Sequence, residues 1–121
     1  MSKPLTRPIV ERARALIADE NHWCRSTLAK DEQDREVRPT DPTARRWCAY
    51  GALVVAAFEF VGDVKQAQKL ADAVAKEVRG QSSLINTNDT KGLAAVLAVF
   101  DQALAADRLE RRELTLLIPL R

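Results

Sequence analysis

The stretch CAYGALVVAAF, residues 48–58, contains eleven residues and no charged side chain. It is about half as long as a membrane-spanning helix, so it predicts a buried helix in a folded protein. A helix without a polar face belongs at the centre of a helical bundle. Gly51 lies inside this helix, where glycine costs about 1 kcal/mol relative to alanine. Its presence there indicates that another part of the backbone crosses close by.

Capping signals upstream of this stretch set the expected start of two helices. Asp41-Pro42 combines a capping carboxylate with a proline at the first helical position, so we expect the central helix to begin there and to end near Phe60. Further upstream, Thr6 can cap a helix in which Ile9 and later apolar residues recur at helical spacing. This first helix is expected to end near Asn21.

Downstream of the central helix, the pattern predicts two or three more helices. Gly62-Asp63 breaks the chain and caps a third helix, with a buried stripe from Val64 to Val78 and an end at Gly80. Asn86 to Thr90 is dense in capping residues and predicts the start of a fourth helix. Asp107 to Glu110 has the spacing of a capping box, which predicts a short fifth helix.

The segment between Arg25 and Pro42 has no helical periodicity. Residues 27–38 fit either a short β-hairpin around an acidic turn or an irregular loop, and we favour the hairpin. The expected fold is therefore mainly α: a compact four- to five-helix bundle with a central apolar helix. A chain of 121 residues is expected to form one domain, residues 1–121.

Composition narrows the classes of function. Hydrophobic residues make up 46% of the chain and charged residues 30%, which is typical of a folded globular protein. A net charge of +2, without a recognised DNA-binding motif, makes nucleic-acid binding only a third choice. No signal-peptide pattern follows Met1, so we expect a cytoplasmic protein with reduced thiols and without membrane attachment. The four glycines form no phosphate-binding loop, and we expect no cofactor.

Two Trp-Cys pairs contain both cysteines, and the chain's one histidine precedes the first pair. Imidazole and thiolate are good zinc ligands, so His22, Cys24, Cys48 and Asp89 could form a metal site. The same residues could form a thiol-dependent catalytic site, with His22 as the base. The spacing matches no common zinc motif, and free cysteines are usually buried core residues. We therefore favour core packing, with a disulfide between Cys24 and Cys48 as a further alternative, and assign no catalytic, cofactor-binding or metal residue.

The Asn-Asp pair offers a further polar site. Asn88 and Asp89 are expected chiefly to cap the fourth helix, although a polar ligand is an alternative. With the two tryptophans they form a candidate polar cluster, whose members are Trp23, Trp47, Asn88 and Asp89.

Three short motifs resemble a family of small, uncharacterised bacterial and phage proteins: Trp23-Cys24, the Cys48-to-Gly51-Ala52 helix and Asn88-Asp89. The resemblance covers most of residues 9–105. It implies that the first turn, the central helix and the fourth helix meet in one cluster, and it brings no known function.

The function that we expect is a non-enzymatic protein-interaction module, which binds another protein or itself. The apolar C-terminal stretch supports this expectation because it could supply a partner contact, and its candidate residues are Leu116, Leu117 and Ile118. The alternative is a small metal- or thiol-dependent enzyme built on the His22, Cys24, Cys48 and Asp89 cluster.

Overall fold

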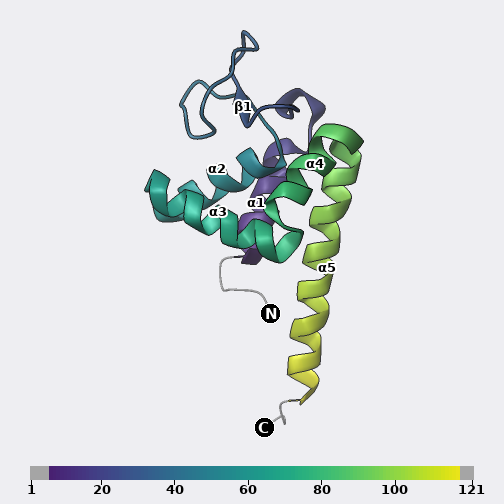
Figure 1. The fold of residues 1–121 in the computed structure, drawn as a ribbon. Helices are drawn as coiled ribbons and strands as arrows, with labels where there is room; N and C mark the ends of the chain where they lie inside the picture. Colours follow the sequence, from purple (N-terminus) through teal and green to yellow (C-terminus); the bar gives the residue numbers. More distant parts are fainter. Residues whose placement is uncertain (1–5, 118–121) are drawn as a thin grey trace.

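Helices dominate the computed structural model, which describes residues 6–117, without the side chains of residues 81 and 108–117. Figure 1 shows the helices gathered below the segment 23–48, which we call the loop. Among the described residues, this loop carries two strands of two residues each. The elements in chain order are α1 (Thr6–Ile17), a 3₁₀ turn (Glu20–His22), β1 (Ala29–Lys30), β2 (Arg46–Trp47), α2 (Ala49–Val61), α3 (Val64–Val78), α4 (Gln81–Lys91) and α5 (Leu93–Leu117). The predicted mainly α bundle is confirmed.

The apolar helix α2 lies at the centre of this arrangement, as its sequence predicts. Its residues from Ala49 to Val54 are all buried, and α1 and α3 pack against it. A Cβ atom on Gly51 would collide with the carbonyl oxygen of Leu28. The expected close backbone crossing is therefore present, and it is made by the segment that leads into β1.

The start of α2 differs from the prediction. Asp41 caps a local turn, because its carboxylate accepts hydrogen bonds from the backbone N–H of Thr43, 2.8 Å away, and from the Thr43 hydroxyl. These bonds hold the pKa of Asp41 below its usual value. The helix begins at Ala49 instead, with Cys48 as its cap. Asp41-Pro42 therefore stabilises a turn, and Trp47, which was expected inside the helix, lies in β2.

The expected hairpin within residues 27–38 is present as a chain reversal. Lys30 bridges Glu36 in antiparallel fashion, and the Asp31 carboxylate holds the turn by accepting from the backbone N–H groups of Gln33 and Arg35. The regular strand pairing is made outside the hairpin: β1 pairs with β2, which lies further along the chain. β1 therefore has a hydrogen-bonding partner on each side, and the pairing with β2 uses backbone groups that a hairpin alone would leave exposed to water.

The prediction for the last two helices was wrong in its boundaries. Residues 86–90 lie within α4, which begins at Gln81, and do not start a new helix. Gly92, at φ 94°, separates α4 from α5. Helix α5 then continues through 107–110 to Leu117, so the expected short fifth helix is not separate. Polar residues on the buried face of α4 conceal this helix from a search for apolar periodicity.

The remaining boundaries are close to expectation. Helix α1 ends at Ile17, a few residues before the predicted Asn21, because Asp19 caps a separate 3₁₀ turn. Asp63 caps α3 as predicted, and Gly62 ends α2 in the left-handed conformation. The C-terminal part of α5 continues past the other helices (Figure 1). Among the described residues, no helix is both long and apolar enough to cross a membrane.

Candidate functional site

Asn88 is the centre of a buried polar network in which α4 meets the segments that follow α1 and precede α2. Its side chain is fully buried. The amide oxygen accepts hydrogen bonds from the Trp23 indole N–H at 2.7 Å and from the Ala49 backbone N–H at 2.9 Å. The amide nitrogen donates to the Cys24 carbonyl oxygen and to Asp89, each at 3.1 Å. Every donor and acceptor position of the amide is used, so Asn88 serves as a structural cross-link.

Asp89 extends the network to the start of the loop. Its carboxylate accepts a hydrogen bond from the backbone N–H of Ser26 at 2.8 Å. Ser26 has φ of 71°, in the left-handed region that non-glycine residues rarely occupy. The Asp89 hydrogen bond therefore helps to hold an unfavourable backbone conformation. Three of the four residues in the predicted polar cluster, Trp23, Asn88 and Asp89, come together in this way.

Trp47, the fourth member of that cluster, points its indole elsewhere. Its indole N–H donates to the carbonyl oxygen of Pro39 at 3.0 Å. Only the backbone of Trp47 joins the network region, because its carbonyl oxygen accepts from the Cys24 N–H at 3.1 Å. Trp47 therefore anchors the far part of the loop, a role that the sequence pattern did not indicate.

Both cysteines are buried free thiols. Cys48 caps α2, and its sulfur accepts the Gly51 N–H at 3.3 Å. Burial raises the pKa of Cys48 and raises the pKa of Cys24 to about 12. Since the thiolate is the nucleophile and the metal ligand, these raised pKa values favour unreactive core thiols at neutral pH.

A small cavity of about 240 Å³ lies beside Cys48 and Asp89, and Glu36 also lines it. The predicted base, His22, is exposed on the 3₁₀ turn and does not line this cavity. Among the described side chains, no group of three or more His, Cys, Asp or Glu residues is arranged to hold a metal ion. The cavity lining thus combines a buried thiol with two carboxylates and does not include the imidazole that was the predicted base.

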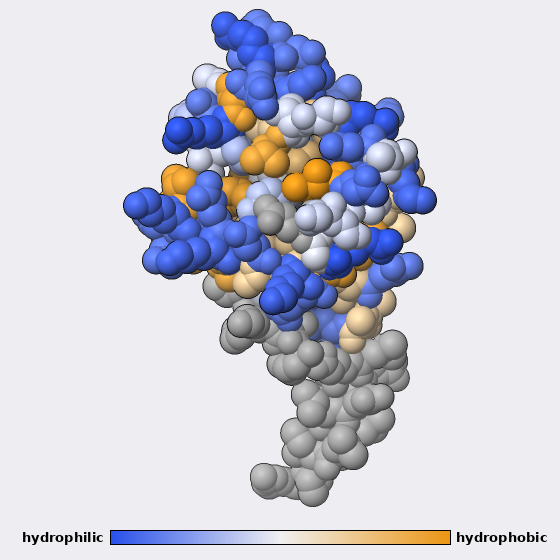
Figure 2. Space-filling model, viewed as in Figure 1, coloured by the Kyte–Doolittle hydropathy of each residue, from blue (hydrophilic) through white to orange (hydrophobic). Residues whose placement is uncertain are grey.

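A larger groove of about 710 Å³ lies between the loop and the helices α2 and α3. Val54 of α2, which is 3% exposed, lies deepest among its apolar residues. Leu28 and Val64 also line it and are 37% and 39% exposed. In Figure 2, apolar side chains gather between the loop and the helices below it and at the corner of α2 and α3, on a largely hydrophilic surface. We call this site the loop–α3 groove; its lining is Thr27, Leu28, Glu36, Val37, Arg38, Pro39, Thr40, Val54, Val64, Lys65 and Gln68.

The sequence pattern missed this groove. Val64 was expected in the buried stripe of its helix, but it is the first residue of α3 and is exposed there. Leu28 and Val37 are isolated apolar residues in a polar stretch, and that isolation is the one signal that could have marked them. Their common location depends on the chain reversal, in which the Val37 N–H donates a hydrogen bond to the Ala29 carbonyl oxygen at 3.1 Å.

Comparison with known proteins places the chain in a family. A family described as "Family of unknown function (DUF6197)" matches residues 1–111. The chain belongs to this family. The expectation of an uncharacterised family is thus confirmed. No curated protein and no solved structure matches the chain, so the function of this DUF6197 protein has to be argued from its surfaces.

The predicted C-terminal contact residues lie at the edge of the described chain. Leu116 and Leu117 belong to α5 by their backbone, and their side chains are outside the described set. Ile118 lies outside the described residues.

Proposed function

We propose that this protein is a non-enzymatic protein-interaction module and that the loop–α3 groove is its docking surface. The observation that carries the proposal is an apolar groove left open to solvent beside a well-buried core. Leu28 and Val64 keep more than a third of their surface exposed, and both line the groove together with Val37, Pro39 and Val54. Exposed apolar surface that is contiguous and bordered by polar residues is typical of a protein-binding site.

The volume and lining of the groove agree with this proposal. About 710 Å³ is room for several side chains, and it falls in the range of ligand sites generally. The most buried apolar residue of the lining is Val54. Arg38, Thr40 and Lys65 are among the polar residues that line the groove. An apolar centre with a polar rim is the usual anatomy of a protein interface.

The enzymatic alternative has less support. The cavity beside Cys48 contains a thiol with a raised pKa, and no histidine lines it. Nucleic-acid binding likewise has no specific observation in its favour, because the chain carries only +2 overall.

The test compares two variants of the full chain in affinity capture from cells that contain it. Val64→Asp places a carboxylate in the groove at the first position of α3, where an acidic residue suits the helix dipole. Ala94→Asp is the matched control, because Ala94 is also exposed in the first turn of a helix and does not line the groove. A protein retained by wild type and Ala94→Asp, but lost with Val64→Asp, is the expected result. Retention by all three chains, or by none, contradicts docking in the groove.

A further inference from the structure

We infer that the loop–α3 groove binds an acidic segment of another protein, which inserts a bulky apolar side chain beside Val54 and places carboxylates along α3. This inference rests on the proposed function and names the chemistry of the partner.

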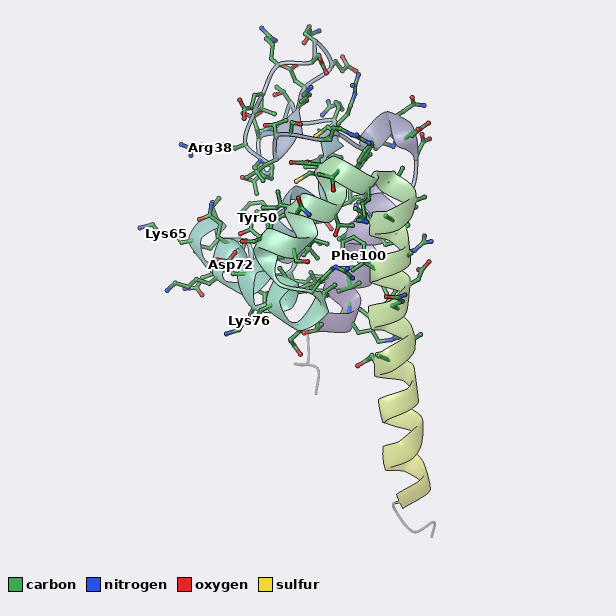
Figure 3. The ribbon with its side chains drawn as sticks, turned by 45° about the vertical axis from the view of Figure 1, so that its right-hand side comes forward. Arg38, Tyr50, Lys65, Asp72, Lys76 and Phe100 are labelled. Carbon is green, nitrogen blue, oxygen red and sulfur yellow. The ribbon has the colours of Figure 1, made fainter. Side chains whose placement is uncertain are left out.

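Basic side chains border the groove on both sides. Arg38 comes from the loop and Lys65 from α3, and both line the groove. Figure 3 shows the two side chains extending to the same side of the molecule, one above and one below the opening between the loop and the helix. A segment lying in the groove would therefore pass between two cations.

The basic character continues along α3. Lys69 and Lys76 lie 4 and 11 residues after Lys65, spacings that place all three lysines on one face of a helix. Asp72 lies on the same face, and it accepts a hydrogen bond from the Tyr50 hydroxyl (Figure 3). This face of α3 therefore carries three lysines and one aspartate, and it is basic overall.

Within the described part of the chain, no ion pair uses these cations. Among the described side chains, ion pairs of 4.0 Å or less involve other basic residues: Arg7, Arg12, Arg14, Lys30, Arg35 and Arg46. The groove's own acid, Glu36, accepts the Thr27 hydroxyl at 2.6 Å. Arg38 and the α3 lysines are therefore free to pair with carboxylates of a partner, which gives a charge-complementary interface.

A second copy of this chain fits the groove less well. Residues 107–121, which contain its apolar C-terminal stretch, carry three acids, Asp107, Glu110 and Glu113, against four arginines, a net charge of +1; the arginines are Arg108, Arg111, Arg112 and Arg121. That stretch has a net positive charge, which the cations around the groove would repel. Charge complementarity therefore favours a different, acidic protein.

The experiment selects peptides from a random displayed library on the immobilised full chain. Synthetic, fluorescent versions of the enriched peptides are then titrated by anisotropy. We expect enriched peptides with a negative net charge and a Leu, Ile, Phe or Met near the carboxylates. Lys65→Glu should weaken their binding by about 3- to 10-fold, and added salt should weaken it further. The matched control is Lys91→Glu, the same charge change on an exposed residue that does not line the groove, and it should leave affinity within about 2-fold.

The outcomes separate this inference from the proposed function. Peptides that are neutral or basic, yet lose binding with Val64→Asp, would overturn the acidic partner and leave docking in the groove intact. No selected peptide, together with a dimer that Val64→Asp dissociates, would make a second copy the occupant and also overturn the inference. If no peptide and no self-association respond to Val64→Asp, then both the inference and the proposed docking surface are wrong.

Discussion

The indole N–H of Trp23 donates a hydrogen bond to the side-chain oxygen of Asn88 at 2.7 Å, across 65 positions of the chain. This bond ties the segment after α1 to α4. The same oxygen accepts the first N–H of α2 from Ala49. One amide therefore fixes the relative positions of three segments, and through them the end of the bundle on which the loop rests (Figure 1).

Replacing Asn88 with alanine should destabilise the protein strongly. The variant leaves the Trp23 indole, the Ala49 N–H and the Cys24 carbonyl without their partner, and each unsatisfied buried group costs about 1–3 kcal/mol. We expect the free energy of unfolding to fall by about 2–5 kcal/mol in urea titrations. Asn86→Ala, at an exposed position of the same helix, is the control and should stay within about 0.5 kcal/mol. Equal losses for both variants would show that the network contributes nothing specific.

Replacing Gly51 with alanine tests whether the change in unfolding free energy is stabilising or destabilising. Helix propensity alone predicts that alanine stabilises α2 by about 1 kcal/mol. The Leu28 carbonyl oxygen, however, occupies the place of the new methyl group. We expect a net loss of about 1–3 kcal/mol, because overpacking forces the backbone apart. Thermal unfolding measures the difference, and a stabilised Gly51→Ala variant would mean that the two segments are not in contact.

The buried thiols predict a loss of stability at alkaline pH. Because the pKa of Cys24 rises to about 12 on folding, the unfolded chain releases its proton first, near the ordinary thiol pKa of about 8.5. The folded state then binds more protons than the unfolded state, so stability falls as pH rises from about 8.5 towards 12. Burial acts on Cys48 in the same direction.

Urea titrations at pH 7 and pH 10 measure this effect. The difference in unfolding free energy should be smaller in Cys24→Ala than in wild type, because the shifted group is gone. An unchanged difference would place the alkaline sensitivity elsewhere. Cys48, whose pKa is raised by burial, and Tyr50, whose pKa is raised by burial and by Asp72, are then the candidates.

The Asp31 turn should loosen in acid. Its carboxylate accepts two backbone N–H groups and the Arg35 side chain, and the Arg35 N–H is the largest cause of its lowered pKa. A lowered pKa stabilises the turn above the ordinary value of about 4, and that stabilisation is lost as pH falls through the folded pKa. Faster hydrogen exchange of the Gln33 and Arg35 amides below pH 4, relative to a reference amide in α2, is the expected result. Asp31→Asn should remove most of this pH dependence.

The C-terminal stretch remains a predicted second contact. Removing residues 114–121 should leave the bundle folded, because the described core residues of α5, Val96, Val99 and Phe100, all lie before the deletion. We expect the shortened protein to keep its helical circular dichroism per residue and to bind its partner more weakly. A shortened protein that unfolds would assign the stretch to the core and remove its role as a contact.

Hydrophobic patterning was enough to predict α1, α3, the central place of α2 and the close backbone approach at Gly51, but it missed α4 as a separate helix. It failed where a polar side chain can either cap a helix or make other hydrogen bonds. Asp41 can cap a helix or a turn; it caps a turn by accepting from Thr43, within a segment that Trp47 closes by donating to the Pro39 carbonyl oxygen. Asn88 looks like a cap in sequence, whereas its partners, Trp23 and Cys24, come from the opposite end of the chain.

The site was harder to predict than the fold. The polar cluster was largely found, because unusual residues such as tryptophan and asparagine are conspicuous. The loop–α3 groove was not found, since its walls come from residues 27–40 on one side and from α2 and α3 on the other. Each wall alone has ordinary composition, and only the folded chain brings them together.

Docking in the groove is tested most directly by amide NMR of the ¹⁵N-labelled full chain, titrated with the tightest-binding selected peptide. The account predicts that chemical-shift changes concentrate in residues 27–28, 36–40 and 64–68. Changes concentrated around Cys48 and Asp89, or spread along α1 and α5 with the groove unaffected, would contradict it.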